Sequence, residues 1–328
     1  MIQLKLSKNI LKLIGAVVLL LLPLLVTNSY FIHIFISIGL YIILSLSLNL
    51  VTGFTGQLAL GHAAFYGIGA YTSALLLLRF NVSYWLALVL SAVITGIFGF
   101  LLGLPALRLK GDYLGIVTLG FGEIVRLVFV NWYSLTRGPL GLPGIPAPKI
   151  GPYIFDSRIP FYYLIFGLAA FTVFFMHRLV NSGVGMAMIT VKEDEIAAES
   201  IGIYPIKYKL LAFSLGAAFA GIAGSFYASY ISFISPDTFL YMDSVTILAM
   251  VVLGGLGSIP GSIIGATVLV IVPELLRFMT NYRMLLYGAL MVFMMIYRPQ
   301  GFWGANKRVR NSYKIGIRGV SNEKDIRG

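Results

Sequence analysis

The charged residues that could do chemistry gather mainly in one short stretch, residues 183–210. Five of them fall within eight positions: Lys192, Glu193, Asp194, Glu195 and Glu199. Lys207 and Lys209 follow. This stretch cannot lie in hydrocarbon, because one charge at mid-bilayer costs roughly 2.5–3.5 kcal/mol on insertion scales. We therefore place residues 183–208 in water, between apolar segments.

Two interpretations of this stretch stay open. One is an ordinary solvated loop, and the other is a short helix that docks on a partner. As a helix it would have two faces, one with Ile189, Lys192, Glu195 and Glu199, the other with Ile196, Ala197, Ser200 and Ile201. Gly202 and Pro205 would then stop it, because both residues are typical just past a helix C-terminus.

Two glycine-rich stretches share a pattern, residues 49–71 and 245–269. Each has an apolar run, a glycine-rich break and a helix of small residues. Such paired interruptions predict a substrate path near mid-membrane and a possible internal repeat. The candidate lining residues are Gly53, Thr55, Gly56, Gln57, His62, Gly254, Gly255, Gly257 and Ser258. Alternatively, the glycines only allow close helix packing, and the two interpretations are compatible. We expect His62 to hydrogen-bond backbone that the break frees.

Charges inside the apolar segments form two pairs with the same spacing, Glu123 with Arg126 and Glu274 with Arg277. Residues three apart share a helical face, so each pair can form an intrahelical ion pair. A structural role is the main expectation, and a gate or proton relay is the alternative. The histidines His33, His62 and His177 are scattered, so no metal site is predicted.

Composition places the chain in a membrane. Of its 328 residues 59% are hydrophobic and 11% charged, whereas soluble domains carry about 25% charged residues. The chain has no cysteine. It has no GxxxxGK[ST] phosphate loop and no HExxH or GxSxG motif, so no catalytic residue is predicted and ATP hydrolysis by such a loop is excluded.

Roughly ten apolar segments approach the length that crosses a bilayer. They span residues 10–27, 30–51, 58–78, 84–104, 112–131, 160–179, 209–233, 243–256, 261–280 and 284–298. We predict an all-α polytopic bundle of about 8–10 spans with glycine-broken helices, and segment 243–256 is short enough to be re-entrant. Residues 1–304 form this transmembrane domain. Residues 305–328 form a basic tail suited to anionic lipid heads.

The basic residues predict the orientation. They concentrate in the N-terminus, in residues 105–111 and 180–208, and in the tail, which places both termini in the cytoplasm. Residues 132–159, rich in glycine and proline, then form a structured cap on the outer face. The net charge of +12 reflects this distribution and does not indicate nucleic-acid binding.

Six stretches, taken in order, resemble the permease subunits of ABC importers for branched-chain amino acids, the LivM-type branch of the LivH/LivM family. They are LSLNLVTGFTGQLALGHAAFYGIGAYTSALL, LRLKGDYLGIVTLGFGEIVRL, TRGPLGLPGIP, GMAMITVKEDEIAAESIGI with KYKLLAFSLGAAFAGIAGSFYA, VLGGLGSIPGSIIGA and YRPQGFWG. They extend from about residue 44 to 304 and so cover most of the chain.

The resemblance implies a multi-pass protein of a prokaryotic cytoplasmic membrane. Its implied partners are a second, LivH-type permease subunit, two ATP-binding cassette subunits that hold ATP and Mg²⁺, and an extracytoplasmic amino-acid-binding protein. This chain itself would bind no cofactor. The coupling helix of such importers maps to about residues 192–202, with Ala197, Ala198 and Gly202 at the family's spacing and Ile196 where a glutamate is usual.

Two further functions stay open. The same scaffold could carry urea, amides or other small solutes. An ion-coupled secondary transporter or channel would need acidic ligands at the breaks, and the breaks contain neither Asp nor Glu. For the importer, we expect Lys at positions 195 and 199 to impair coupling without unfolding the spans.

Overall fold

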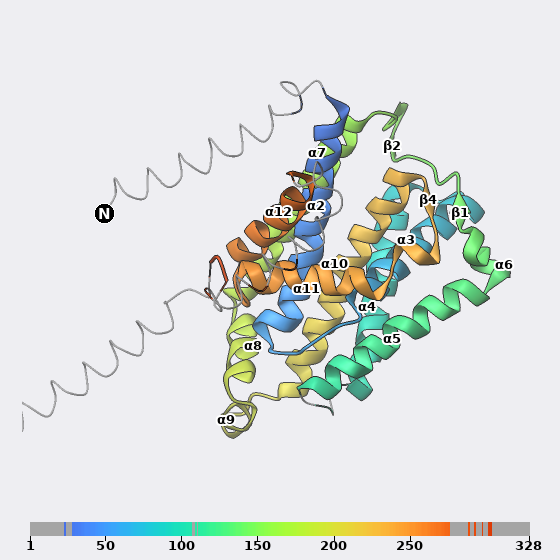
Figure 1. Ribbon diagram of the computed structural model, residues 1–328. Coiled ribbons are helices and arrows are strands. Elements are labelled where there is room, and N and C mark those ends of the chain that lie inside the picture. The colour runs from blue at the N-terminus through green and yellow to red at the C-terminus, as the bar shows by residue number, and fades with distance from the viewer. Residues whose placement is uncertain are drawn as a thin grey trace, which may run out of the picture.

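The computed structural model is a bundle of long helices (Figure 1). It describes residues 28–106, 109, 111–275 and 301–303, together with the single positions 23, 288, 292 and 297. Apart from those single positions, the predicted spans 10–27 and 284–298 lie outside the described residues, as does the basic tail 305–328. In the described part, six helices are long and apolar enough to cross a membrane, which agrees with a polytopic all-α membrane protein.

The helices follow the predicted apolar segments. The long ones are α2 (Ser29–Asn49), α3 (His62–Arg79), α4 (Tyr84–Ala106), α5 (Asp112–Asn131), α7 (Arg158–Val180), α10 (Pro205–Ile231), α11 (Tyr241–Gly254) and α12 (Ile259–Leu275). The short ones are the π-helix η1 (Leu50–Phe54), α6 (Tyr133–Thr136), η2 (Gly138–Leu140), α8 (Gly183–Glu193), α9 (Glu195–Ser200) and η3 (Pro236–Thr238). The six candidate spans are α2 with η1, α4, α5, α7, α10, and η3 with α11.

Helix α10 packs against α3 and α4 at the centre of the bundle. Glycines allow this contact, because a Cβ on Gly69 would lie 2.4 Å from Cα of Gly221. Gly224 is as tight, since its Cβ would lie 2.2 Å from the carbonyl oxygen of Tyr66. The packing role predicted for the small residues is thus confirmed at this contact.

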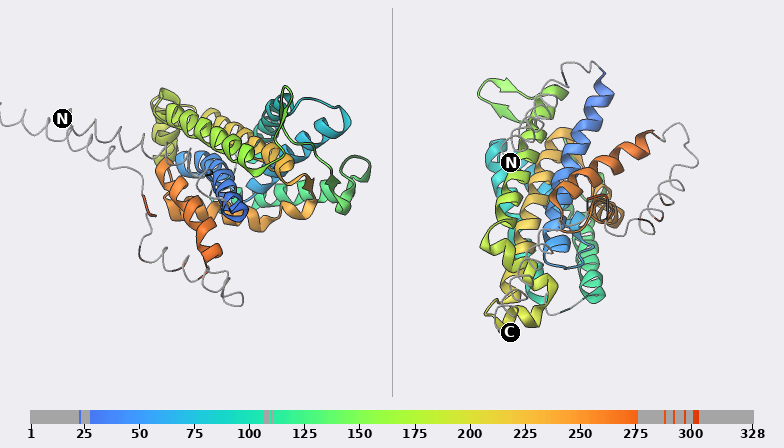
Figure 2. Two further views of the ribbon diagram at one scale, coloured as in Figure 1. Left: turned by 90° about the horizontal axis from the view of Figure 1, so that it is seen from above. Right: turned by 90° about the vertical axis from the view of Figure 1, so that its left-hand side faces the viewer.

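The loop predicted to cap the outer face is structured. Strand β1 (Leu142–Pro143) pairs antiparallel with β4 (Phe233–Ile234), and β2 (Lys149–Ile150) pairs with β3 (Tyr153–Ile154). The hairpin of β2 and β3 lies at one end of the molecule, and α8 and α9 lie at the other (Figures 1 and 2). The cap and the charged stretch therefore occupy opposite ends.

Both predicted breaks are present. After α2 the chain passes through η1 and then runs without helix from Thr55 to Gly61 before α3 begins. Helix α11 ends at Gly254, where Gly255 and Gly257 take φ values of 117° and 78°, conformations that glycine adopts readily. A π-helix next to a break is a frequent feature of functional sites.

Candidate functional site

The charged stretch forms two short helices and not the single helix predicted. Helix α8 ends at Glu193, and Asp194 is extended, with φ −157° and ψ 115°. Its carboxylate accepts hydrogen bonds from the backbone N–H groups of Ile196 (2.8 Å) and Ala197 (3.0 Å). Asp is a favoured N-cap residue, so it starts α9 and separates Lys192 from Glu195. The prediction that Ile189, Lys192, Glu195 and Glu199 share one helical face was therefore wrong.

The end of α9 was predicted in part. Gly202 follows the helix with a φ of 81°, as expected of a residue just past a helix end. Pro205 does not end α9. It occupies the first turn of α10, where its missing N–H would have no partner in any case. We refer to residues 183–206 as the docking segment, after the role expected of it.

Lys192 turns from the docking segment toward the first break. Its Nζ donates a hydrogen bond of 2.8 Å to the carbonyl oxygen of Gly53, in η1. Gly56 packs beside the same side chain, because a Cβ there would lie 3.2 Å from Cγ of Lys192. Nζ also lies 3.7 Å from where a Cβ of Gly257 would be. One lysine thus reaches both breaks.

Asn49 joins the two breaks directly. It is fully buried, and its Oδ1 accepts a hydrogen bond of 2.9 Å from the N–H of Gly257. Its Nδ2 donates one of 3.1 Å to the carbonyl oxygen of Ser258. A Cβ on Gly53 would lie 1.7 Å from Oδ1 of Asn49, so only glycine fits there. We call Asn49, Gly53, Gly257 and Ser258 the break junction.

Sequence reasoning did not select Asn49. The available signal was a single carboxamide in an apolar run, immediately before the glycine-rich break. A buried polar group needs a partner, and at that position the freed backbone of a second break can supply it.

The other candidate path residues mostly complete hydrogen bonds within their own break. Thr55 donates to the carbonyl oxygen of Val51 (2.7 Å), and Gln57 donates to that of Thr55 (3.2 Å). In the second break, Ser258 Oγ accepts from the N–H of Gly261 at 3.2 Å. Such bonds satisfy backbone groups that a broken helix leaves free.

The glycines of the second break serve close backbone contacts. A Cβ on Gly254 would lie 2.1 Å from the carbonyl oxygen of Gly261. The N–H of Gly255 lies 2.5 Å from where a Cβ of Gly301 would be. The second break therefore packs closely against the start of α12 and against Gly301.

His62 has a different hydrogen-bond partner from the one predicted. It is 1% exposed, and its Nε2 lies 2.7 Å from the hydroxyl of Ser47. The predicted bond to freed backbone is wrong, because His62 already starts α3 and faces the side of α2. The histidine instead joins the two helices that flank the first break.

The rest of the docking segment divides into an anchored side and an exposed side. Ala198 is fully buried, and Glu195 pairs with Lys209 of α10 at 2.5 Å. Glu193, Ala197 and Glu199 are exposed. The exposed apolar side chains are Ile196 (74%), Ile201 (69%), Tyr204 (74%) and Ile206 (58%). We call these four the apolar patch. Exposed apolar groups beside charged ones are typical of a protein-binding surface.

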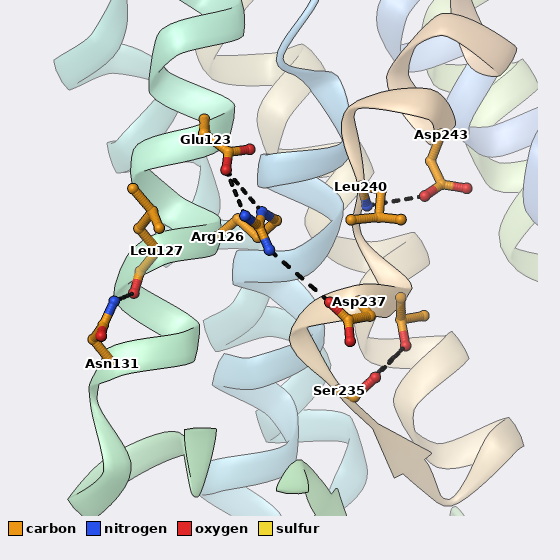
Figure 3. A network of polar contacts seen from close by, with 9 residues as sticks. Glu123, Arg126, Leu127, Asn131, Ser235, Asp237, Leu240 and Asp243 are labelled. Atoms are coloured by element: carbon orange, nitrogen blue, oxygen red, sulfur yellow. Dashed lines mark hydrogen bonds and ion pairs between the residues drawn. The ribbon is translucent and has the colours of Figure 1, made fainter. Parts of the chain in front are cut away.

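The first predicted ion pair is present, and it includes a third charged residue that was not predicted. Arg126 donates to Oε1 of Glu123 from Nε (3.0 Å) and Nη2 (2.6 Å). Its Nη1 also lies 4.0 Å from Asp237 of η3, so the pair connects α5 to the entrance of α11 (Figure 3). In the second predicted pair, Arg277 lies outside the described residues.

Comparison with known proteins gives the family. Residues 30–295 match the family described as "Branched-chain amino acid transport system / permease component". The chain belongs to this permease family. It is 44% identical over 285 residues to the high-affinity branched-chain amino acid permease protein LivM of Salmonella typhimurium, a match that covers 80% of this chain and 67% of that protein.

Two other relatives support this placement. LivM of Escherichia coli is 43% identical over 285 residues, with the same coverage. A probable LivM of Methanocaldococcus jannaschii is 28% identical over 313 residues, covering 80% of this chain and 90% of that protein. No solved structure matches the chain.

The candidate site of the permease lies inside the family match. Both breaks, the docking segment and the Glu123–Arg126 pair fall between residues 30 and 295. The first predicted span and the basic tail lie outside it. The whole candidate site therefore falls within the residues that match the family model.

Proposed function

We propose that this chain is the membrane subunit through which an ATP-driven ABC importer moves leucine, isoleucine and valine. The observation that carries the proposal is the 44% identity, over 80% of the chain, to a protein named as a high-affinity branched-chain amino acid permease. Two contacts support it. Lys192 connects the docking segment to the first break, and Asn49 connects the first break to the second.

The proposed partners are those of the importers that this chain resembles. The chain has no phosphate loop of its own, and two ATP-binding cassette subunits would hold ATP and Mg²⁺. A LivH-type second permease completes the membrane path, and an extracytoplasmic binding protein delivers the amino acid. The docking segment, through its apolar patch and exposed Glu193 and Glu199, is the surface that receives an ATPase subunit.

The proposed orientation puts the docking segment in the cytoplasm, together with both termini, and the cap with β2 and β3 outside. The arrangement of α9 and this cap at opposite ends supports it. The surrounding membrane is the cytoplasmic membrane of a prokaryote, and the basic tail contacts its lipid heads.

The proposed mechanism is alternating access driven through the docking segment. ATP binding closes the ATPase dimer and displaces α9 with its binding groove. Lys192 and the Glu195–Lys209 pair transmit this displacement to η1 and α10. The break junction then rearranges, and the membrane path opens to the outside to receive substrate. Hydrolysis resets it inward.

The test is transport by the reconstituted complex. The chain is co-expressed with its genomic neighbours and reconstituted in vesicles with ATP inside and the binding protein outside. We expect uptake of radiolabelled leucine, isoleucine and valine that requires ATP, and no uptake of urea. Uptake of urea or an amide in place of leucine would assign another cargo. Leucine uptake driven by an ion gradient without ATP would contradict the importer.

A further inference from the structure

Lys192 occupies an unexpected position for a residue of a docking surface. It is the second-last residue of α8 and lies two residues before Asp194, the N-cap of α9. Its ammonium does not point to the apolar patch. It bonds instead to the carbonyl oxygen of Gly53, 139 positions away in the sequence.

The acceptor is also unusual. Gly53 belongs to the five-residue π-helix η1, and its own Cα packs against Asn49 and the N–H of Gly257. A π-helix places its carbonyl groups out of the regular i to i+4 register. A charged donor makes a stronger hydrogen bond to such a carbonyl than a neutral one does. The lysine therefore binds η1 where η1 touches the second break.

The neighbouring glycines make the contact sensitive to position. Gly56 has a φ of 71° and Gly257 a φ of 78°, and neither has a side chain to separate Lys192 from the backbone. Nζ of Lys192 is 3.7 Å from the position of a Cβ at Gly257. If α8 moved by about one ångström, the hydrogen bond from Lys192 to the carbonyl oxygen of Gly53 would become longer than its ordinary range.

We propose that Lys192 is the positioning residue that couples the docking segment to the break junction. Its hydrogen bond to Gly53 holds η1 against Gly257 in the state described here. Movement of α9 withdraws the ammonium, so η1 is released from the second break and the path can rearrange. The proposal rests on the proposed function, because it assigns one element of the same importer.

The test compares substitutions of Lys192 in the complete, reconstituted complex. K192M removes the donor and keeps an unbranched side chain, and K192R keeps a charged donor. R178M is the matched control, because Arg178 is an exposed cation in the last turn of α7, outside the docking segment. Three quantities are measured: recovery of the assembled complex, ATP hydrolysis with and without loaded binding protein, and leucine molecules transported per ATP hydrolysed.

We expect K192M to assemble and to hydrolyse ATP. Stimulation by the loaded binding protein, and the leucine transported per ATP, should fall on the order of tenfold, which is within the usual span of coupling between sites. K192R should keep most of both quantities, and R178M should match the wild type. A residue with a purely structural role would lower recovery and leave the transport ratio of the assembled complex unchanged.

Wild-type stimulation and transport ratio in K192M would overturn the proposal. If K192M does not assemble, K192Q takes its place, and equal transport ratios in K192Q and K192R would overturn it as well. The proposed function would stand in both cases, because wild-type complex that transports leucine with ATP tests it separately.

Discussion

The ammonium of Lys209 lies 2.5 Å from Oε1 of Glu195, although only 2% of Lys209 is exposed. Lys209 belongs to α10 and Glu195 to α9. This ion pair therefore fixes α9 to the bundle. A buried lysine is costly unless it is paired.

We expect E195Q to destabilise the protein more than K209M does. E195Q leaves a buried ammonium without its carboxylate, which should cost about 3 kcal/mol. K209M removes the buried charge and leaves the Glu195 carboxylate, whose side chain is 29% exposed and can be solvated, so it should cost less. The thermal unfolding temperature of the purified chain in detergent measures both. E199Q is the control, because Glu199 is exposed, and equal unfolding temperatures for E195Q and E199Q would contradict this role of the ion pair.

This ion pair also changes the design of the charge-reversal experiment. A lysine at position 195 would place two ammonium groups together, so it would disturb the fold and docking at the same time. Glu199 is exposed and is not a member of this ion pair, so E199K alone separates the two effects. We expect E199K to lower binding-protein-stimulated ATP hydrolysis while the unfolding temperature stays within error of the wild type.

Asn49 should be essential to the contact between the breaks. N49A removes the acceptor of the Gly257 N–H and one of the donors to the carbonyl oxygen of Ser258, which also accepts from the N–H of Ser262. The unpaired N–H of Gly257 should cost about 2 kcal/mol. N49D keeps an acceptor for Gly257 but loses the donor to Ser258, so it should also be destabilised. The control is N131A, since Asn131 is exposed at the end of α5. An unfolding temperature of N49A equal to that of N131A would contradict the bridge.

Close packing of α3 and α10 should tolerate no side chain at Gly69. G69A places a Cβ 2.4 Å from Cα of Gly221, and the resulting overpacking should destabilise the protein by about 1–3 kcal/mol. G167A is the control, because no atom lies within 4 Å of a Cβ there. Alanine is also the better helix former, so G167A should be neutral or slightly stabilising. The measurement is the unfolding temperature of each variant. Similar values for G69A and G167A would contradict close packing of α3 and α10 at Gly69.

The Glu123–Arg126 pair should be structural. R126Q leaves Glu123 and Asp237 without their cation, and the loss should be about 1 kcal/mol because all three side chains are partly exposed. The double variant E123Q/R126Q should recover stability and transport leucine at the wild-type rate. A stable double variant that has lost uptake would instead place the pair in a gate or relay.

The ends of several elements follow from local sequence alone. Residues 112–131 were predicted as an apolar segment, and α5 has these bounds because Gly111, with a φ of 58°, precedes it and Asp112 suits a first turn. The breaks were predicted in the same way, since glycines near Gly53 and Gly257 interrupt apolar runs. The family resemblance rested on these stretches.

The contacts that make up the site could not be predicted this way. Lys192 and Gly53 are 139 positions apart, and Asn49 and Gly257 are 208 apart. Nothing in either local sequence specifies the other. The docking segment was misjudged for a related reason, because helical periodicity across residues 189–199 ignores the preference of Asp194 for an N-cap. Tyr204, Ile206 and Lys209 were missed because their exposure and pairing depend on where α10 begins.

The measurement that tests the importer most directly is co-purification from native membranes. The tagged wild-type chain is compared with I196D/I201D, which puts charges into the apolar patch, and with L140D, an equally exposed apolar site at the cap end. We expect an ATPase and a second permease to accompany the wild type and L140D. The double variant should keep the second permease and lose the ATPase, with an unchanged unfolding temperature. A wild-type chain that purifies alone, or an ATPase that I196D/I201D retains in full, would contradict the coupling surface proposed for this permease.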